Sequence, residues 1–180
     1  MYPILRGPMN EDVLTPKFLT REMAEVAVET AVETVFGLEV VKPRRDQVHV
    51  VVLVPGMTDE QPDGRPRGDY QIRPVTLYEY SRGHQEDYAF PFDEIAPCKA
   101  LQLWQDRNDG RTDIIPHLLF AGDAPYWGGV KRQGIVVACS GIQPWLDKLI
   151  ASMVADLLIA MAHDAWVNSS DKAEEVSLLT

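Results

Sequence analysis

The pattern of apolar and polar positions predicts a sheet built from two long strands and a hairpin. Residues 48–54 form a near-continuous apolar run, which the Pro-Gly dipeptide at 55–56 is expected to end. Such a run is typical of a central strand covered on both faces, or covered by a partner subunit. Residues 75–80 alternate with period two and should pair with it. Residues 130–139 predict a hairpin that turns at Gly134, because glycine accepts positive φ.

Apolar residues at helical spacing predict three helices. Thr20 is a good N-cap for the first, which should end at Gly37. The second is predicted over residues 97–107, with its proline in the first turn, where a missing N–H is tolerated. The third should cover about residues 144–166. The predicted apolar face of the second helix consists of Cys98, Leu101 and Trp104.

The last predicted helix carries a broad apolar band. A band of this width can cover a sheet and still touch another subunit, so we expect a homo-oligomer. Light scattering that gives a mass of about 20 kDa would contradict this expectation. The band consists of Trp145, Leu149, Ile150, Met153, Val154, Leu157 and Met161.

The first predicted helix carries an acidic stripe on another face than its apolar residues. The glutamates recur every three or four positions, which places them on one side of a helix. We interpret the stripe as solvated surface. Its members are Glu22, Glu25, Glu29 and Glu33.

These elements favour a single α+β domain. Strands of period two separated by helical segments predict a two-layer sandwich of a mainly antiparallel sheet with flanking helices. We expect the domain over residues 19–166, an N-terminal arm at 1–18 and a C-terminal tail at 167–180. Residues 57–74 read as an inserted polar loop, either an arm that binds a partner protein or a surface insertion.

Composition and charge argue against several classes of function. The chain has 180 residues and a formal net charge of −10, and a nucleic-acid binder would need a basic face. Charged residues interrupt the apolar region 146–162, so no membrane span is predicted. Residues 1–14 lack the apolar core of a signal peptide, so we expect a soluble, cytoplasmic protein. The two cysteines make no disulfide framework, and Cys139 should behave as a small buried hydrophobe.

Motifs of known chemistry are sparse. Gly128-Gly129-Val130 is not a phosphate loop, because no Lys-Ser/Thr follows it. Ser140 has no Gly-x-Ser-x-Gly context, so no catalytic residue is predicted. The four histidines lie on separate predicted elements, and His49 reads as a hydrogen-bonded structural residue. A composite metal site from distant residues stays open.

The order of short motifs resembles the GlcG/HbpS-like family, which includes the C-terminal domain of PduO-type proteins. Gly-Gly-Val, a turn glycine and an apolar strand ending in Ser140-Gly141 are followed by Asp147 and Ile150-Ala151. Upstream lie Leu19-Thr20 before an Ala-rich helix, the strand at 48–54, and Glu94-Ile95-Ala96 followed by Lys99-Ala100. The resemblance spans about residues 19–160 and implies a profilin-like sandwich, oligomerisation and, in several members, haem binding.

A haem site needs an apolar slot, an axial ligand and cations near the propionates. Tyr126 and Trp127 with Gly128 and Gly129 could build the slot, although the two aromatics could equally be interface anchors. The axial ligand could be His117 or His84, and Lys131 or Arg132 could meet a propionate. For each histidine a structural role is the alternative.

Two classes of function remain. The resemblance favours a non-enzymatic accessory protein of a metabolic pathway that binds a small molecule or haem. The alternative is an enzyme, or the small subunit of one, acting on a small organic molecule near residues 126–129. If a ligand approaches the backbone at Gly128 or Gly129, alanine at one of them should weaken binding while the fold survives.

Overall fold

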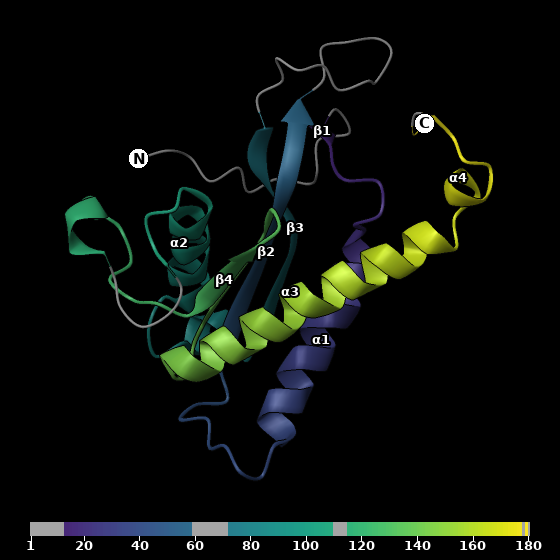
Figure 1. The fold of residues 1–180 in the computed structure, drawn as a ribbon. Coiled ribbons are helices and arrows are strands. Elements are labelled where there is room, and N and C mark those ends of the chain that lie inside the picture. The colour runs from purple at the N-terminus through teal and green to yellow at the C-terminus, as the bar shows by residue number, and fades with distance from the viewer. Residues whose placement is uncertain (1–12, 59–71, 110–114, 178, 180) are drawn as a thin grey trace.

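The computed structural model describes residues 13–58, 72–109, 115–177 and 179. Within them, five strands form one antiparallel sheet (Figure 1). Strand β2 (Val48–Thr58) lies between β3 (Ile72–Arg82) and β5 (Ile135–Ser140), and β4 (Gly129–Arg132) pairs with the other side of β5. The short β1 (Val13–Leu14) pairs with the far end of β2. The α+β class with an antiparallel sheet is therefore confirmed.

Both long strands extend further than predicted. The prediction that residues 55–56 end β2 is wrong, because β2 continues to Thr58 and β3 begins at Ile72. Pro55 lies opposite Pro74 in the ladder, so the two residues that lack an N–H face each other. The ends of the expected 57–74 loop therefore belong to the strands, and residues 59–71 lie outside the described residues.

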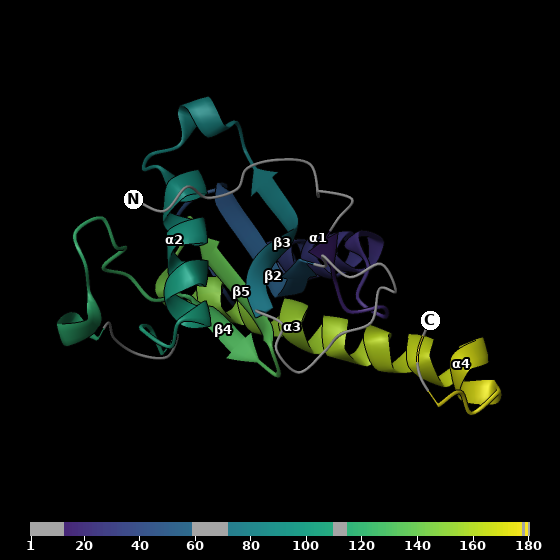
Figure 2. The same ribbon diagram turned by 90° about the horizontal axis from the view of Figure 1, so that it is seen from above.

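The helices cover both faces of the sheet (Figures 1 and 2). Helices α1 (Arg21–Gly37) and α3 (Pro144–Val167) pack on one face, and α2 (Phe92–Trp104) packs on the other. Alternate residues of β2 divide between the faces, since Val50 and Val52 join the α1/α3 core while Val51 and Leu53 join the α2 core. The smaller α2 core also contains Ala96, Ala100, Leu103, Val136 and Ala138.

Helix boundaries follow the sequence at α1 and α3 but not at α2. The Thr20 hydroxyl accepts a hydrogen bond from the Met23 amide at 3.2 Å, as expected of an N-cap. Helix α2 begins at Phe92, five residues before the predicted start, and contains Pro97 in its interior. The residues expected on one face of α2, Cys98, Leu101 and Trp104, are half-buried, and Leu101 and Trp104 pack against the α2 core. The buried residues of α2 are Phe92, Ala96, Pro97, Lys99, Ala100, Gln102 and Leu103.

The fold itself uses most of the apolar band of α3. Ile150 and Val154 are fully buried, and Leu149, Met153, Leu157 and Met161 pack partly buried against the same core. Trp145 remains 55% exposed at the start of the helix. Among the described helices, none combines the length and the apolar composition needed to cross a bilayer.

The two ends of the described chain contact each other. Lys17 Nζ lies 2.6 Å from a carboxylate oxygen of Asp171, which belongs to the short helix α4 (Ser170–Ala173). The ring of Phe18 packs edge-on against Trp166 with centroids 5.5 Å apart. Parts of the expected arm and tail are thus held against α3.

Candidate functional site

The hairpin β4–β5 positions the Gly-Gly step. Gln133 and Gly134 form its two-residue turn, with φ of 47° and 85°, as the sequence predicts for the glycine. The ladder continues beyond the end of β4, since the Cys139 amide donates to the Gly128 carbonyl at 3.0 Å. Gly128 therefore lies beside the last residues of β5, and its φ of 129° is one that L side chains rarely adopt.

A buried polar network lies against Gly128. Lys99 Nζ donates to the Cys139 carbonyl at 2.9 Å and lies 3.7 Å from Asp147 Oδ2. Asp147 Oδ1 accepts the Ile142 amide at 3.3 Å and lies 3.5 Å from Cys139 Sγ. The Lys99 and Asp147 side chains are only 3% and 4% exposed. The network therefore holds an ion pair that is almost completely removed from water.

The pair joins the two faces of the sheet. Lys99 comes from α2 on one face, whereas Asp147 comes from the first turn of α3 on the other. A Cβ on Gly128 would lie 2.8 Å from Asp147 Cβ and 3.3 Å from Lys99 Nζ. The missing side chain of Gly128 thus leaves the space in which the two charged groups meet.

Burial shifts the pKa values of the three ionisable groups. Loss of hydration raises the pKa of the Asp147 carboxyl to about 6, and the Lys99 ammonium opposes this only in part. The same loss lowers the pKa of Lys99, although Asp147 favours its charged form. Burial and the Asp147 carboxylate also raise the pKa of the Cys139 thiol well above its ordinary value. Cys139 therefore remains a protonated, weakly nucleophilic thiol, in agreement with the role predicted for it.

The Asp147 carboxyl should make stability fall as pH rises through the weakly acidic range. Its folded pKa of about 6 exceeds the ordinary 3.8, so between these values the folded state binds more protons than the unfolded state. This contribution is complete below pH 3.8 and is lost as pH passes 6. We expect a total loss of about 2–3 kcal/mol.

Urea unfolding of wild type and Asp147→Asn between pH 4 and pH 7 measures this effect. Carboxyls with lowered pKa values, such as Asp123 beside Arg107, act in the opposite direction in both proteins and cancel in the difference. The free energy of unfolding of wild type relative to the variant should decline across the range. A difference that is independent of pH would contradict the assigned shift.

The predicted ligand residues are dispersed in the structure. His84 precedes the 3₁₀ turn Gln85–Asp87, between β3 and α2, whereas His117 lies in the turn Pro116–Leu118, between α2 and β4. Both are exposed, and no hydrogen bond, ion pair or ring contact among the described residues joins either to segment 126–131. Lys131 Nζ is held by the Trp104 carbonyl at 2.9 Å and by Asp106 at 2.8 Å.

The aromatic pair before the glycines lies at the surface. Tyr126 is 52% exposed, and its carbonyl accepts a hydrogen bond from Asn108 at 3.2 Å. Trp127 is half-buried. A Cβ on Gly129 would lie 2.6 Å from Leu103 Cδ1 and 2.8 Å from the Val137 carbonyl oxygen. The space that we expected a ligand to use at the two glycines is filled by the protein's own atoms.

His49 occupies the structural role predicted for it. Its Nδ1 lies 2.8 Å from the Ser81 hydroxyl on the neighbouring strand, and the side chain is buried. Within the described ranges, no three His, Cys, Asp or Glu side chains converge in a way that could hold a metal ion.

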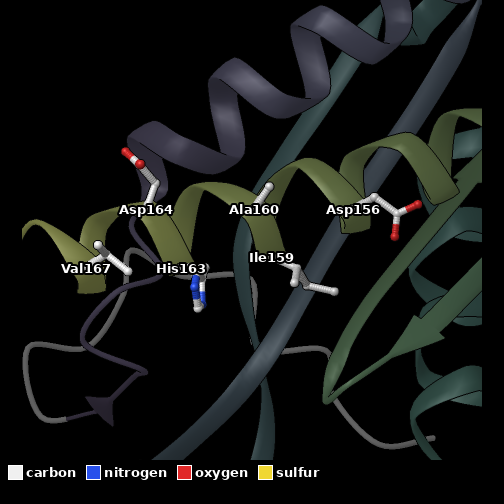
Figure 3. Close-up of a pocket in the computed structure, with 6 residues that line it drawn as sticks. All are labelled: Asp156, Ile159, Ala160, His163, Asp164 and Val167. Atoms are coloured by element: carbon white, nitrogen blue, oxygen red, sulfur yellow. The ribbon is translucent and has the colours of Figure 1, made fainter.

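An open groove of about 620 Å³ runs along the last turns of α3 (Figure 3). Ile159 and His163 point to the same side of the helix, and Val167, 52% exposed, lies one turn further on. The described residues that line it are Asp156, Ile159, Ala160, His163, Asp164 and Val167. The groove therefore combines apolar side chains, one imidazole and two carboxylates.

Sequence reasoning missed the roles of Lys99 and Asp147. Both occur among the family-like motifs, yet nothing there suggested that they meet. A usable signal was present, because Lys99 falls at helical spacing among Ala96, Ala100 and Leu103, which are buried. A charge inside an apolar helix face implies a buried partner.

No protein-family model, curated protein or solved structure matches this chain.

Proposed function

We propose that this chain is a non-enzymatic accessory protein of the cytoplasm that binds a small organic molecule. The groove along α3 is the observation that carries the proposal. Its open space of about 620 Å³ is enough for a small molecule to lie along the helix. The ligand would lie across the apolar side chains of Ile159, Ala160 and Val167.

The carboxylates of the groove define the charge of the ligand. Asp164 is exposed, and Asp156 forms an ion pair with Arg132 of β4. Carboxylates beside an apolar surface attract cations and repel anions. The proposed ligand is therefore a molecule with an apolar body that is neutral or cationic.

Haem fits the described residues only in part. At the Tyr126 end, Lys131 is bound to Asp106 and the protein's own atoms occupy the Cβ positions of the two glycines, which disfavours haem there. At the groove, His163 offers an imidazole beside apolar side chains, but the exposed carboxylate of Asp164 disfavours the propionates, and Arg132 is already engaged by Asp156. Haem is thus a candidate for the groove rather than for the predicted loop.

Self-association belongs to the same proposal. Large aromatic side chains remain exposed on the loop before β4 and at the start of α3, namely Phe120, Tyr126 and Trp145. Exposed aromatics are common anchors of subunit interfaces. A homo-oligomer would cover them, and light scattering at micromolar concentration measures its mass.

A neutral apolar dye tests the groove. We expect Nile red to bind wild-type protein with a rise in fluorescence, and Val167→Asp to weaken binding by at least about fivefold through lost apolar contact and added charge. The matched control is Val40→Asp, the same change at a valine that is 88% exposed and lies outside the groove. Equal dissociation constants for the two variants would exclude the groove as the binding site.

A hemin titration followed at the Soret band tests haem separately. Saturation at one hemin per chain that is lost in His163→Ala would place haem in the groove. Loss in His117→Ala or His84→Ala instead would return it to the residues predicted from the sequence. An unshifted Soret band would exclude haem as the ligand. The Nile red titration would still test whether the groove binds a small molecule.

An enzyme that acts on a small organic substrate is the second candidate. The buried pair of Lys99 and Asp147 favours it, because perturbed pKa values cluster at catalytic sites. A substrate would have to reach side chains that are only 3% and 4% exposed. Reductive trapping of Lys99 with a small aldehyde and borohydride would favour this function, and a lysine that stays unmodified in folded protein would exclude imine chemistry there.

A further inference from the structure

Strand β3 is an open edge of the sheet. Among the described residues it pairs only with β2, while β5 and β1 pair with the opposite side of β2. Figure 2 shows β3 as the outermost strand on the side of α1. The outer backbone groups of an edge strand can hydrogen-bond an added strand. β3 therefore offers the main-chain half of a peptide site.

The acidic side of α1 borders this edge. Tyr78 and Tyr80 of β3 pack against the core under α1. Burial raises the pKa of the Tyr78 phenol, and the nearby carboxylates of Glu25 and Glu29 raise it further. Burial likewise raises the pKa of the Tyr80 phenol, Arg82 opposes the rise, and Glu33 and Glu29 add to it. Glu25 and Glu29 are exposed, so their carboxylates face solvent on the helix that packs over β3.

Arginine side chains mark the two ends of this surface. Arg21 lies over the ring of Tyr78, 5.2 Å from its centroid. At the other end Arg82 forms ion pairs with Glu33, at 2.8 Å, and with Asp46. The protein's own arginine thus already engages Glu33, and the carboxylates offered to a partner are those of Glu25 and Glu29.

The spacing of these carboxylates matches that of a β-strand. Residues four apart on a helix are separated by about 6 Å along its axis. Alternate residues of a strand, which point to the same face, are separated by about 6.6–6.8 Å. Basic side chains at alternate positions of an extended peptide therefore have a spacing similar to that of Glu25 and Glu29 on α1.

We propose that β3 and the acidic side of α1 form a docking site for an extended basic peptide of a partner protein. The peptide adds to β3 as a further strand and directs alternate lysine or arginine side chains to Glu25 and Glu29. Main-chain hydrogen bonds supply the geometry, and the carboxylates select the charge. This site is separate from the α3 groove, so neither proposal depends on the other.

The charge selection is tested by calorimetry with a blocked peptide that alternates lysine and threonine. We expect micromolar binding that weakens with salt, and a loss of about fivefold or more in the double variant Glu25→Gln/Glu29→Gln. The matched control, Glu39→Gln/Glu174→Gln, removes the same charge at two other exposed glutamates and should bind like wild type. Equal losses of affinity in the two double variants would mean that only the net charge of the protein matters. This result would overturn the proposed docking site.

Strand addition is tested with two N-methylated versions of the same peptide. Amides of successive residues in a strand point to opposite edges, so one version is methylated at every lysine and the other at every threonine. Pairing with β3 predicts that one version loses binding and the other retains it. Retention by both would overturn strand addition, as would loss of binding by both.

Discussion

Replacing Lys99 by methionine is expected to lower the free energy of unfolding by about 3–5 kcal/mol. The variant leaves Asp147 buried without its cation, and the Cys139 carbonyl loses the ammonium that donates to it at 2.9 Å. Without Lys99 to oppose the effect of burial on the Asp147 pKa, the carboxyl must either stay charged without a partner or take up a proton at pH 7, and both cost stability. Urea unfolding at pH 7, monitored by circular dichroism, measures the loss.

A second lysine provides the matched control. Lys131 also donates to a backbone carbonyl and to an aspartate, at 2.9 and 2.8 Å, but its partner Asp106 is 78% exposed. Lys131→Met should therefore cost less than about 1 kcal/mol. In the double variant Lys99→Met/Asp147→Asn the loss should be smaller than the sum of the single losses, with a coupling of about 1–3 kcal/mol. Additive losses would mean that the two side chains act independently.

The fold was predictable where local signals and tertiary packing agree. The N-cap at Thr20 and the positive φ at Gly134 rest on local chemistry, and the structure confirms both. Prolines misled the prediction at two places, because tertiary packing can outweigh the local cost of a missing N–H. In β2 the residue facing Pro55 is Pro74, and in α2 the buried face extends on both sides of Pro97.

For the candidate site, the sequence predicted the backbone feature at Gly128 but not the side chains that meet there. The sequence indicated a close approach at Gly128, and the structure contains one, but the approaching atoms belong to Lys99 and Asp147. Their side chains come from opposite faces of the sheet, 48 positions apart in the chain, so only the three-dimensional arrangement brings them together. The groove was also missed. In the sequence its lining residues look like the ordinary surface of a helix, with apolar and polar side chains mixed.

The buried network of Lys99 and Asp147 serves stability, whereas the α3 groove and the edge of β3 are the proposed binding surfaces. The network fixes α2 and α3 against the end of β5, and its groups have almost no contact with solvent. The groove and the edge of β3 lie outside the core, where substitutions usually change stability by less than about 0.5 kcal/mol. Binding variants at Val167, Glu25 and Glu29 should therefore remain folded, which allows binding and stability to be measured separately.

Gly128→Ala is expected to lower the free energy of unfolding by about 3 kcal/mol or more. The new Cβ would meet Asp147 Cβ at 2.8 Å and approach Lys99 Nζ, so relieving the contact must displace the buried pair. The backbone adds a second cost, because φ is 129° at this residue. Urea unfolding measures the total, and binding of Nile red by the protein that remains folded should be unchanged.

Two other glycines separate the backbone cost from the packing cost. Gly122 also has positive φ, 94°, but nothing lies within 4 Å of its Cβ position, so Gly122→Ala should cost only about 1 kcal/mol. Gly37 lacks both features, and Gly37→Ala should be close to neutral. If Gly128→Ala costs no more than Gly122→Ala, the space at Gly128 does not maintain the pair. Loss of dye binding in Gly128→Ala at unchanged stability would instead show that a ligand reaches the backbone at this step.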